Sequence, residues 1–227
     1  NQARDETHAT MTVNGAVELY HNNVKKIETT SSGVNVTGNV VSNDGSNNAR
    51  FQFDNNNQIL IENDSAMNFY VNGNNNLKID SAGHVTKPLQ PAFLATNTNA
   101  TQSSFAVGAL VDVVFGVEVF DQNADFASNT FTAPITGRYQ FNVNCRLDDM
   151  DSAANYYIIR IITSNRNYTH IWDSNEFSSD TNYFTLQVSC LADMDASDTA
   201  KVIVYQDGGT QQTAVINASY FSGYLVA

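Results

Sequence analysis

Two acidic turns hold the residues of this sequence best suited to bind a metal ion. The segment CRLDDMDSA begins at Cys145 and CLADMDAS begins at Cys190, so each continues a cysteine-bearing strand into an Asp-Met-Asp turn. If both turns lie at the same end of a β-sandwich, their carboxylates converge, and Ca²⁺ favours oxygen ligands of this kind. The candidate metal ligands are Asp148, Asp149, Asp151, Asp193, Asp195 and Asp198. Because aspartate is also a common turn residue, solvated turns without an ion are the alternative.

A second candidate site surrounds the only tryptophan. The segment NRNYTHIWDSNEF, residues 165–177, is interpreted as a loop that places aromatic rings beside carboxylate and amide groups. Such a combination suits a sugar, because rings stack on its C–H faces while polar groups bond its hydroxyls. The candidate ligand-binding residues are Tyr168, Trp172, Asp173, Asn175 and Glu176. The alternative is that Trp172 belongs to the core.

The remaining reactive residues show no spacing typical of catalysis. His8, His21, His84 and His170 are isolated from one another and from the two cysteines. No nucleophile elbow, phosphate loop or dinucleotide fingerprint occurs, and the acidic residues cluster in polar turns, whereas a glycosidase needs paired carboxylates across a cleft. We therefore predict that the protein is not an enzyme and that no cofactor is certain, with Ca²⁺ as the one candidate.

The net charge of −12 narrows the classes of partner. Without a Lys/Arg stripe to neutralise phosphates, nucleic acid is not expected as a partner. No apolar run approaches the ~18 residues of a transmembrane helix, so we expect no membrane insertion. Cys145 and Cys190 each fall in phase with an alternating apolar row. They are expected to be buried thiols, with a disulfide as the alternative if they face each other.

The N-terminal part of the chain is rich in Asn and Gly and repeats a phrase. VELYHNN begins at Val17, FQFDNNN at Phe51 and MNFYVNGNNN at Met67. Each phrase joins an aromatic-bearing strand to a second strand through an Asn-rich turn, which predicts β-hairpins. The uneven spacing of the copies indicates a loose repeat rather than a solenoid. Since an isolated hairpin is marginal in water, we expect a shaft in which several chains bury these faces jointly; an Asn-rich disordered tail is the alternative.

Two prolines, Pro88 and Pro91, mark the boundary between two kinds of sequence, because proline donates no backbone hydrogen bond. We predict a hairpin shaft over residues 1–87, a linker over 88–92 and a head over 93–227. Long alternating strands without helical periodicity predict an antiparallel all-β sandwich for the head. The expected strands cover residues 111–120, 138–147, 156–163, 183–192, 200–206 and 218–227.

The start of one head strand carries a recognisable motif. FTAPITGRYQF places Phe131, Gly137, Tyr139 and Phe141 in the pattern Phe-x5-Gly-x-Tyr-x-Phe, which resembles the hallmark of complement C1q-type globular heads. The segments FGVEVFD, LADMDASDTAKVIVY and YFSGYLVA resemble further parts of that family in the same order. The resemblance covers residues 91–227, with Val143 in place of the last aromatic residue of the hallmark. The Asn-rich hairpins resemble, more weakly, the shafts of bacteriophage tail fibres.

The C1q resemblance implies a ten-stranded jelly roll, related to tumour necrosis factor and assembled as a trimer. Alternation in the last strand directs Phe221 into the sandwich and Tyr220 and Tyr224 out of it. An exposed aromatic patch would be covered by a neighbouring subunit near a threefold axis. The predicted trimer-interface residues are Tyr183, Tyr220 and Tyr224. Scattered surface tyrosines are the alternative.

These observations predict a non-enzymatic homotrimeric fibre protein of a bacteriophage virion, with a C1q-like tip for receptor binding or host adhesion. Its expected partners are a host cell-surface receptor or glycan and other virion proteins. One alternative is a purely structural virion protein, whose head trimerises and caps the shaft. The other is a secreted, extracellular C1q-type ligand.

Overall fold

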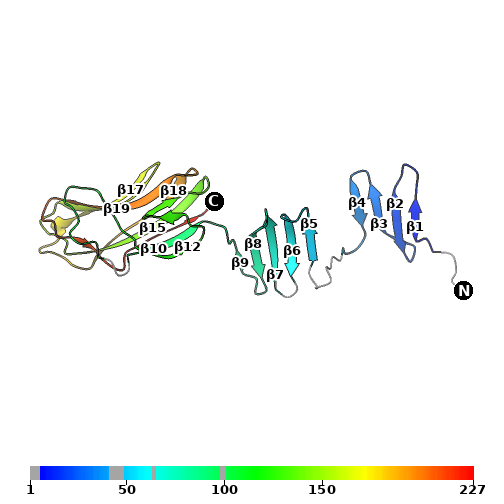
Figure 1. Cartoon of the computed structure of the whole chain (residues 1–227), viewed down its shortest axis with the longest axis horizontal. Coiled ribbons are helices and arrows are strands. Elements are labelled where there is room, and N and C mark those ends of the chain that lie inside the picture. The colour runs from blue at the N-terminus through cyan, green and yellow to red at the C-terminus, as the bar shows by residue number, and fades with distance from the viewer. Residues whose placement is uncertain (1–5, 41–48, 63–64, 98–100) are drawn as a thin grey trace. The chain divides into compact units, whose positions relative to one another are not determined.

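The computed structural model describes residues 6–40, 49–62, 65–97 and 101–227, and these residues form an all-β structure (Figure 1). One 3-10 turn, η1 (Ser174–Glu176), is the single helical element in these ranges. The chain divides into two compact units, Asn1–Thr86 and Lys87–Ala227, which we call the hairpin unit and the head. Within the described ranges, no helix is long and apolar enough to cross a membrane.

The hairpin unit contains two antiparallel sheets, each paired in sequence order. The first sheet is formed by β1 (Ala9–Met11), β2 (Val17–His21), β3 (Val24–Thr30) and β4 (Gly33–Val36). The second is formed by β5 (Ala49–Gln52), β6 (Gln58–Glu62), β7 (Ala66–Val71), β8 (Asn74–Asp80) and β9 (Val85–Thr86).

Asparagine explains the tight turns of the two central hairpins, as the sequence predicts. Asn22 and Asn23 join β2 to β3 with φ of 51° and 59°, and Asn72 and Gly73 join β7 to β8 with φ of 51° and 76°. Both central residues of a type I′ turn need positive φ, which Asn and Gly adopt most readily.

The two sheets of the hairpin unit are copies of one motif, offset by 50 residues (Leu19 to Phe69, Ile27 to Leu77). Leu19 pairs with Ile27 and Phe69 pairs with Leu77, and a bulge follows the first residue of each pair. The third phrase, which begins at Phe51, belongs to the second sheet as β5 and β6, so the three phrases are unevenly spaced although the two sheets are related by one offset.

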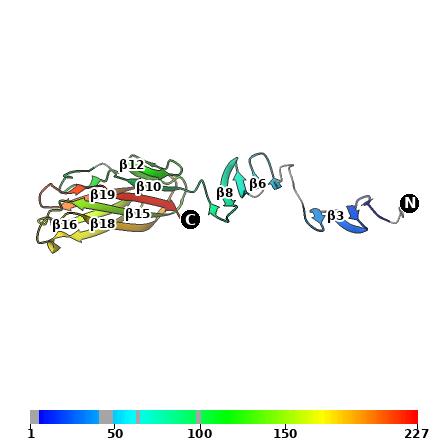
Figure 2. The same cartoon turned by 90° about the horizontal axis from the view of Figure 1, so that it is seen from below.

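The head is a jelly-roll sandwich of two six-stranded antiparallel sheets, which confirms the predicted jelly-roll fold with twelve strands rather than ten (Figure 1 and Figure 2). Sheet I has the order β12 (Val117–Asp121), β10 (Ala92–Thr96), β21 (Tyr220–Leu225), β15 (Gly137–Asp148) and β18 (Phe184–Met194). Sheet II has the order β13 (Phe126–Ala127), β14 (Thr130–Thr132), β19 (Thr199–Asp207), β16 (Tyr156–Thr163) and β17 (Asn167–Asp173). Two short strands, β11 (Val111–Asp112) and β20 (Ala214–Val215), pair with β19 and β15.

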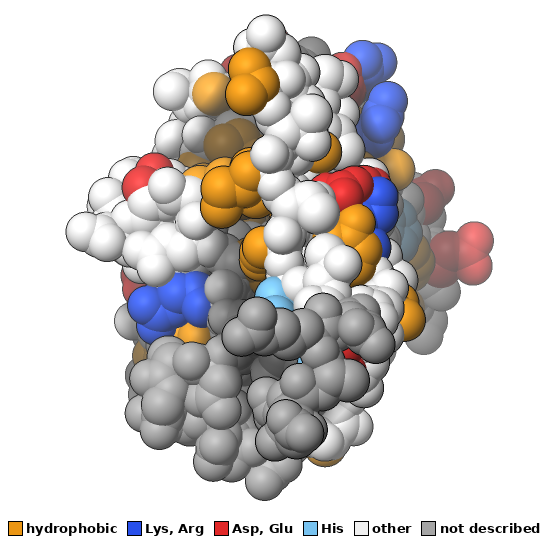
Figure 3. Space-filling view, turned by 90° about the vertical axis from the view of Figure 1, so that its right-hand side faces the viewer, with side chains coloured by type: hydrophobic (Ala, Val, Ile, Leu, Met, Phe, Trp, Pro, Cys, Tyr) orange, Lys and Arg blue, Asp and Glu red, His pale blue; other side chains and the backbone are white. Residues whose placement is uncertain are grey.

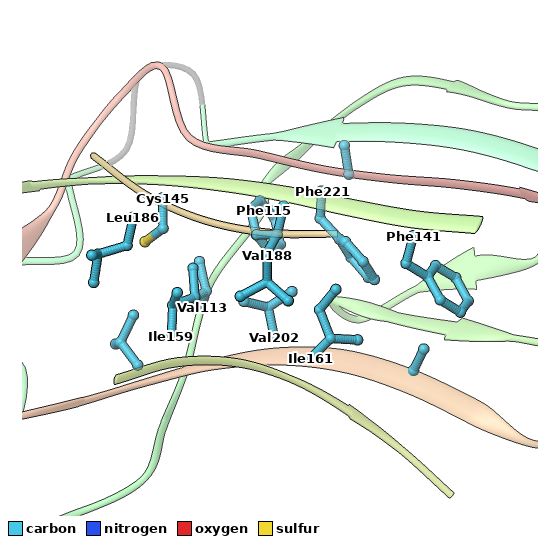
Figure 4. Close-up of a cluster of buried hydrophobic side chains, with 14 of the residues drawn as sticks. Val113, Phe115, Phe141, Cys145, Ile159, Ile161, Leu186, Val188, Val202 and Phe221 are labelled. Carbon is cyan, nitrogen blue, oxygen red and sulfur yellow. The ribbon is translucent and has the colours of Figure 1, made fainter. Parts of the chain in front are cut away.

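Side chains from both sheets meet in one core (Figure 4). Phe131 is fully buried, and its ring centroid lies 5.1 Å from that of Phe93 and 5.5 Å from that of Phe141. A Cβ added to Gly223 would lie 2.5 Å from Phe141 and 2.8 Å from Phe93, so only glycine fits at this position. Phe131 and Phe141 of the sequence motif and Gly223 of the last strand thus serve the packing of the sandwich.

Two predicted segments differ from the structure. The apolar run 111–120 is not one strand, because β11 pairs with sheet II and β12 pairs with sheet I. Between them, the backbone N–H groups of Val114 and Phe115 donate to side-chain oxygens of Gln102 and Asn129 instead of to a strand. The region predicted as a loop around Trp172 is largely strand β17, which pairs with β16 along its whole length.

Both cysteines are buried free thiols that face the core of the sandwich. Cys190 pairs with Phe141 and Cys145 pairs with Leu186, so the two residues do not lie opposite each other on neighbouring strands. Burial raises the pKa of Cys145 to about 12 and that of Cys190 to about 11. The thiols therefore behave as small apolar side chains.

Candidate functional site

The two acidic turns lie at opposite ends of sheet I, so the predicted convergence of six carboxylates is wrong. Strands β15 and β18 are antiparallel neighbours, and the turn that follows one strand lies beside the start of the other. Arg138 pairs with Asp193, whereas Asp148 lies ten residues further along β15, a separation of about 34 Å. In the described part of the chain, no group of three or more His, Cys, Asp or Glu residues is placed to hold a metal ion.

Protein donors already bind several of these carboxylates. Asp148 accepts a hydrogen bond from the backbone N–H of Tyr183 (2.7 Å). At the other end of the sheet, Arg166 makes a two-point contact with Asp193, with N···O distances of 3.2 and 3.1 Å. The guanidinium of Arg166 lowers the pKa of Asp193. Calcium binding stays a prediction of the sequence alone.

The structure separates the candidate ligand-binding residues into two places. Trp172, on β17, packs against the edge of the core, with ring centroids 4.3 Å from Phe177 and 4.7 Å from Phe184. Its packing corresponds to the core alternative. Asp173, Asn175 and Glu176 follow at the end of the strand, where the Asp173 carboxylate accepts a bond from the Asn175 backbone N–H (2.9 Å) and caps η1.

Tyr168 lies near the opposite end of β17 from Trp172, a separation that a loop assignment does not predict. There it lines an open depression of about 450 Å³ together with Arg138, Arg166, Leu191 and Asp193. Arg166 and Asp193 form an ion pair, which leaves Arg138 as the remaining charged side chain that lines this depression. The other candidate ligand-binding residues do not line this depression.

At the end of the head that holds Asp173, hydrogen bonds join three loops, which we call the loop end. Asp180 accepts bonds from the backbone N–H and hydroxyl of Ser152 (3.0 and 2.9 Å) and from the side chain of Gln212 (2.7 Å). Met150 and Thr181 exchange backbone bonds of 2.9 and 3.0 Å. The bond from the Ser152 N–H, with those from Gln212 and the Ser152 hydroxyl, lowers the pKa of Asp180. The loops from residues 149–155, 174–183 and 208–213 are thus held together.

A buried polar group anchors the same loops from below. Asp151 is 5% exposed and accepts bonds from the backbone N–H groups of Ala153 (2.7 Å) and Thr210. Its own N–H donates to the hydroxyl of Tyr157, which lies 2.8 Å from the Thr213 hydroxyl. Since these groups are satisfied inside the protein, the exposed surface of the loop end is preorganised.

The outer face of sheet I is the second candidate surface. Its central strands present uncharged side chains joined across the strands, where Ser189 Oγ lies 2.9 Å from Gln140 Nε2 and 2.8 Å from Asn142 Oδ1. Exposed apolar side chains surround this polar centre: Phe120 50%, Leu191 53%, Tyr220 37% and Tyr224 49% exposed. Between Arg138 and Arg146, the outward positions of β15 carry no charged side chain.

The predicted interface tyrosines all lie on or beside this face. Tyr220 and Tyr224 project outward from β21 between β10 and β15, opposite the buried Phe221. Tyr183 precedes β18 and is 72% exposed, and the guanidinium of Arg146 lies 4.6 Å from its ring centroid. The structure therefore groups Tyr220 and Tyr224 with other apolar residues, and places Tyr183 at the end of the face.

The outer face of sheet II has a different chemistry. Lys201 forms an ion pair with Asp112, with an N···O distance of 2.8 Å, and Arg160 donates a 2.9 Å hydrogen bond to Thr169. Charged side chains are well solvated in water and costly to bury. Of the two outer faces, the one on sheet I is the better suited to contact another protein.

Sequence reasoning missed Phe120 and Leu191 as members of the outer face of sheet I. Alternation along β18 does place Leu191 outward, opposite the inward Cys190. For Phe120 no simple alternation would have sufficed, because a bulge between Leu94 and Ala95 shifts the register of β10 against β12. The hydrogen bonds of the loop end were also missed, since they join residues far apart in sequence.

Comparison with known proteins finds solved structures that are similar to part of this chain at low sequence identity. No protein-family model matches the chain, and no curated protein matches it. The globular domain of zebrafish complement 1qA protein is 17% identical, with 61% of this chain and 98% of that chain covered and a TM-score of 0.43. The PRD1 vertex protein P5 is 13% identical over 61% and 98% of the two chains, with a TM-score of 0.44. Murine APRIL is 10% identical over 60% and 99%, with a TM-score of 0.41. The strand order, and not these scores, carries the assignment of the fold.

Proposed function

We propose that the protein is a non-enzymatic homotrimeric fibre protein of a virion, whose head assembles through the outer face of sheet I. The observation that carries the proposal is the uncharged face that includes Tyr220, Tyr224, Phe120 and Leu191. On a chain of net charge −12, such a face is where copies meet with the least repulsion. A closed trimer of this kind buries the exposed rings and leaves the charged face of sheet II in solvent.

Host recognition is assigned to the loop end of the head. The strands are committed to the core and to the proposed trimer, whereas loops carry binding residues on a rigid scaffold. The hydrogen bonds of Asp180 and Asp151 hold the loops in place before a ligand arrives. Asn175 and Glu176 are exposed there, and their amide and carboxylate groups suit a glycan or a polar protein receptor.

The sequence of the hairpin repeats favours a virion over a secreted ligand, because the repeats resemble phage fibre shafts. A purely structural role is the second candidate. In that case the head trimerises and caps the fibre, and the loop end binds no receptor. The two roles share the trimer and differ only in whether loop-end variants affect adsorption.

The trimer is tested with a matched pair of variants. Tyr224→Glu adds a charge to the outer face of sheet I, and Ile171→Glu adds the same charge to the outer face of sheet II, where Ile171 is 60% exposed. Sedimentation equilibrium at micromolar concentration should give three chains for the wild type and for Ile171→Glu, and a lower mass for Tyr224→Glu. Equal behaviour of the two variants would contradict the assignment of the face.

Receptor binding is tested on the intact trimer. Asn175→Ala combined with Glu176→Ala changes two exposed loop-end residues and should abolish adsorption of particles to host cells, with the mass and melting temperature retained. The double variant Thr169→Ala, Ile171→Ala on the exposed face of β17 is the control and should adsorb normally. Unchanged adsorption by the loop-end variant would favour the structural role.

A further inference from the structure

Each sheet of the hairpin unit has one apolar face, which we call the apolar face of that sheet. In the first sheet, strand pairing brings together Ala9, Met11, Val17, Leu19, Ile27, Thr29, Val34 and Val36. In the second sheet it brings together Ala49, Phe51, Ile59, Ile61, Met67, Phe69, Leu77, Ile79 and Val85. Neither set contains a charged residue. Surface hydrophobic side chains are visible in the space-filling view of Figure 3.

These faces are incompletely covered within the hairpin unit. Leu19 is 42%, Phe51 56% and Ile61 38% exposed, although each lies within a paired strand. In the head, by contrast, the equivalent inward rows are almost fully buried, because a second sheet lies against the first. Contiguous exposed apolar surface on a soluble protein marks a contact with another molecule.

The opposite face of the first sheet is polar and is satisfied internally. Glu18 accepts hydrogen bonds from Tyr20 (2.6 Å), Thr10 (2.9 Å) and Lys25 (3.1 Å), and Lys25 also pairs with Glu28. The bonds from Tyr20, Thr10 and Lys25 lower the pKa of Glu18 to about 2. A face whose charges are already paired on its own sheet is suited to remain in solvent.

The duplication identifies the occupant of the apolar faces. The motif recurs at an offset of 50 residues, and the apolar positions recur with it: Ala9 with Ile59, Leu19 with Phe69 and Ile27 with Leu77. A partner that covers both faces must present two matching surfaces along one chain. Another copy of this chain has that property by symmetry.

We propose that the two sheets of the hairpin unit are two copies of one self-association module. In each module, the apolar face packs against the apolar faces of the equivalent sheets in the other copies of the chain. The inference rests on the proposed trimer, which brings the copies together. The partner is thus the same protein, and each module forms its own interface.

Neighbouring residues on β7 provide a matched pair of variants. Phe69 belongs to the apolar face and Tyr70 to the polar one, and both are partly exposed. Phe69→Glu places a charge in the proposed interface, whereas Tyr70→Glu places it on the opposite face of the same sheet, beside the uncharged Gln58 and Asn75. Leu19→Glu is the counterpart of Phe69→Glu in the first module.

Hydrogen exchange on the full chain reads out each module separately, with sedimentation giving the number of chains. In the wild-type trimer the amides of both sheets should be protected. Phe69→Glu should remove the protection of the amides in β5 to β9 and retain that of the amides in β1 to β4. Leu19→Glu should have the reverse effect. Tyr70→Glu should leave the protection of both sheets unchanged. The head keeps all variants trimeric.

Three results would overturn the inference. Protection of the second sheet in Phe69→Glu would show that its apolar face is not an interface, and equal loss in Tyr70→Glu would show that the two faces are equivalent. An unprotected hairpin unit in a wild-type trimer would show that the trimer does not fold it. A wild-type chain that is monomeric would instead contradict the proposed trimer, which the mass reports independently of exchange.

Discussion

The head and the hairpin unit use similar strands but bury them to different extents. In the head, Phe131 is fully buried between two sheets, whereas Phe51, on β5 of the hairpin unit, is 56% exposed. Each sheet of the hairpin unit has alternating apolar residues and well-formed turns, although its apolar face is only partly covered within the hairpin unit. The difference shows that strand alternation predicts a face to be buried without saying which chain buries it.

The largest expected effect lies in the core of the head. Phe131→Ala should lower the free energy of unfolding of the head by about 3–5 kcal/mol, because it removes a ring that packs between Phe93 and Phe141. Phe53→Ala removes the same ring from an exposed position and should change stability by less than about 0.5 kcal/mol. Chemical denaturation of both variants measures the contrast, and similar losses would mean that Phe53 is buried in the assembly.

Trp172 tests where the core of the head ends. Its contacts with Phe177 and Phe184 lead us to expect that Trp172→Ala destabilises the head by about 3 kcal/mol. Trp172→Phe should retain most of that stability. If Trp172→Ala melts like the wild type but no longer adsorbs to cells, the ring is a binding residue and the packing interpretation is wrong.

Acid should weaken both units, through different carboxylates. Folding lowers the pKa of Glu18 from 4.5 to about 2 and lowers that of Asp180 from 3.8. The stability that each carboxylate adds is present above its unfolded pKa and is lost as the pH falls through its folded pKa. Asp180→Asn should therefore lower the melting temperature of the head near neutral pH, and the difference from the wild type should shrink as the pH falls below 3.8. A difference in melting temperature that stays constant as the pH falls would show that the charge of the Asp180 carboxylate does not cause it.

Calcium should have the smallest effect. A ligand that binds only the folded state adds about 2.7 kcal/mol at ~100 Kd, which thermal denaturation detects readily. Because the two acidic turns lie at opposite ends of sheet I, we expect millimolar Ca²⁺ to leave the melting temperature of the head unchanged. A rise that Asp149→Asn removes would show that one turn alone holds an ion.

The sequence predicts the fold of the head well, because the alternation of apolar residues and the Phe131 motif indicate locally which side chains face the core. It also predicts the direction of Tyr220 and Tyr224 for the same reason. It fails on the acidic turns, since the direction of β18 against β15 is a property of the topology and not of either segment. It fails on the loop around Trp172 because polar residues on the outward side of an edge strand look like loop residues.

Sedimentation equilibrium of the full wild-type chain at micromolar concentration tests the central claim, self-association, most directly. We expect the mass of three chains of 24.9 kDa. Because few charged side chains lie in the proposed interfaces, added salt should strengthen the association of the chains only modestly. The mass of a single chain at that concentration would contradict the account of both units.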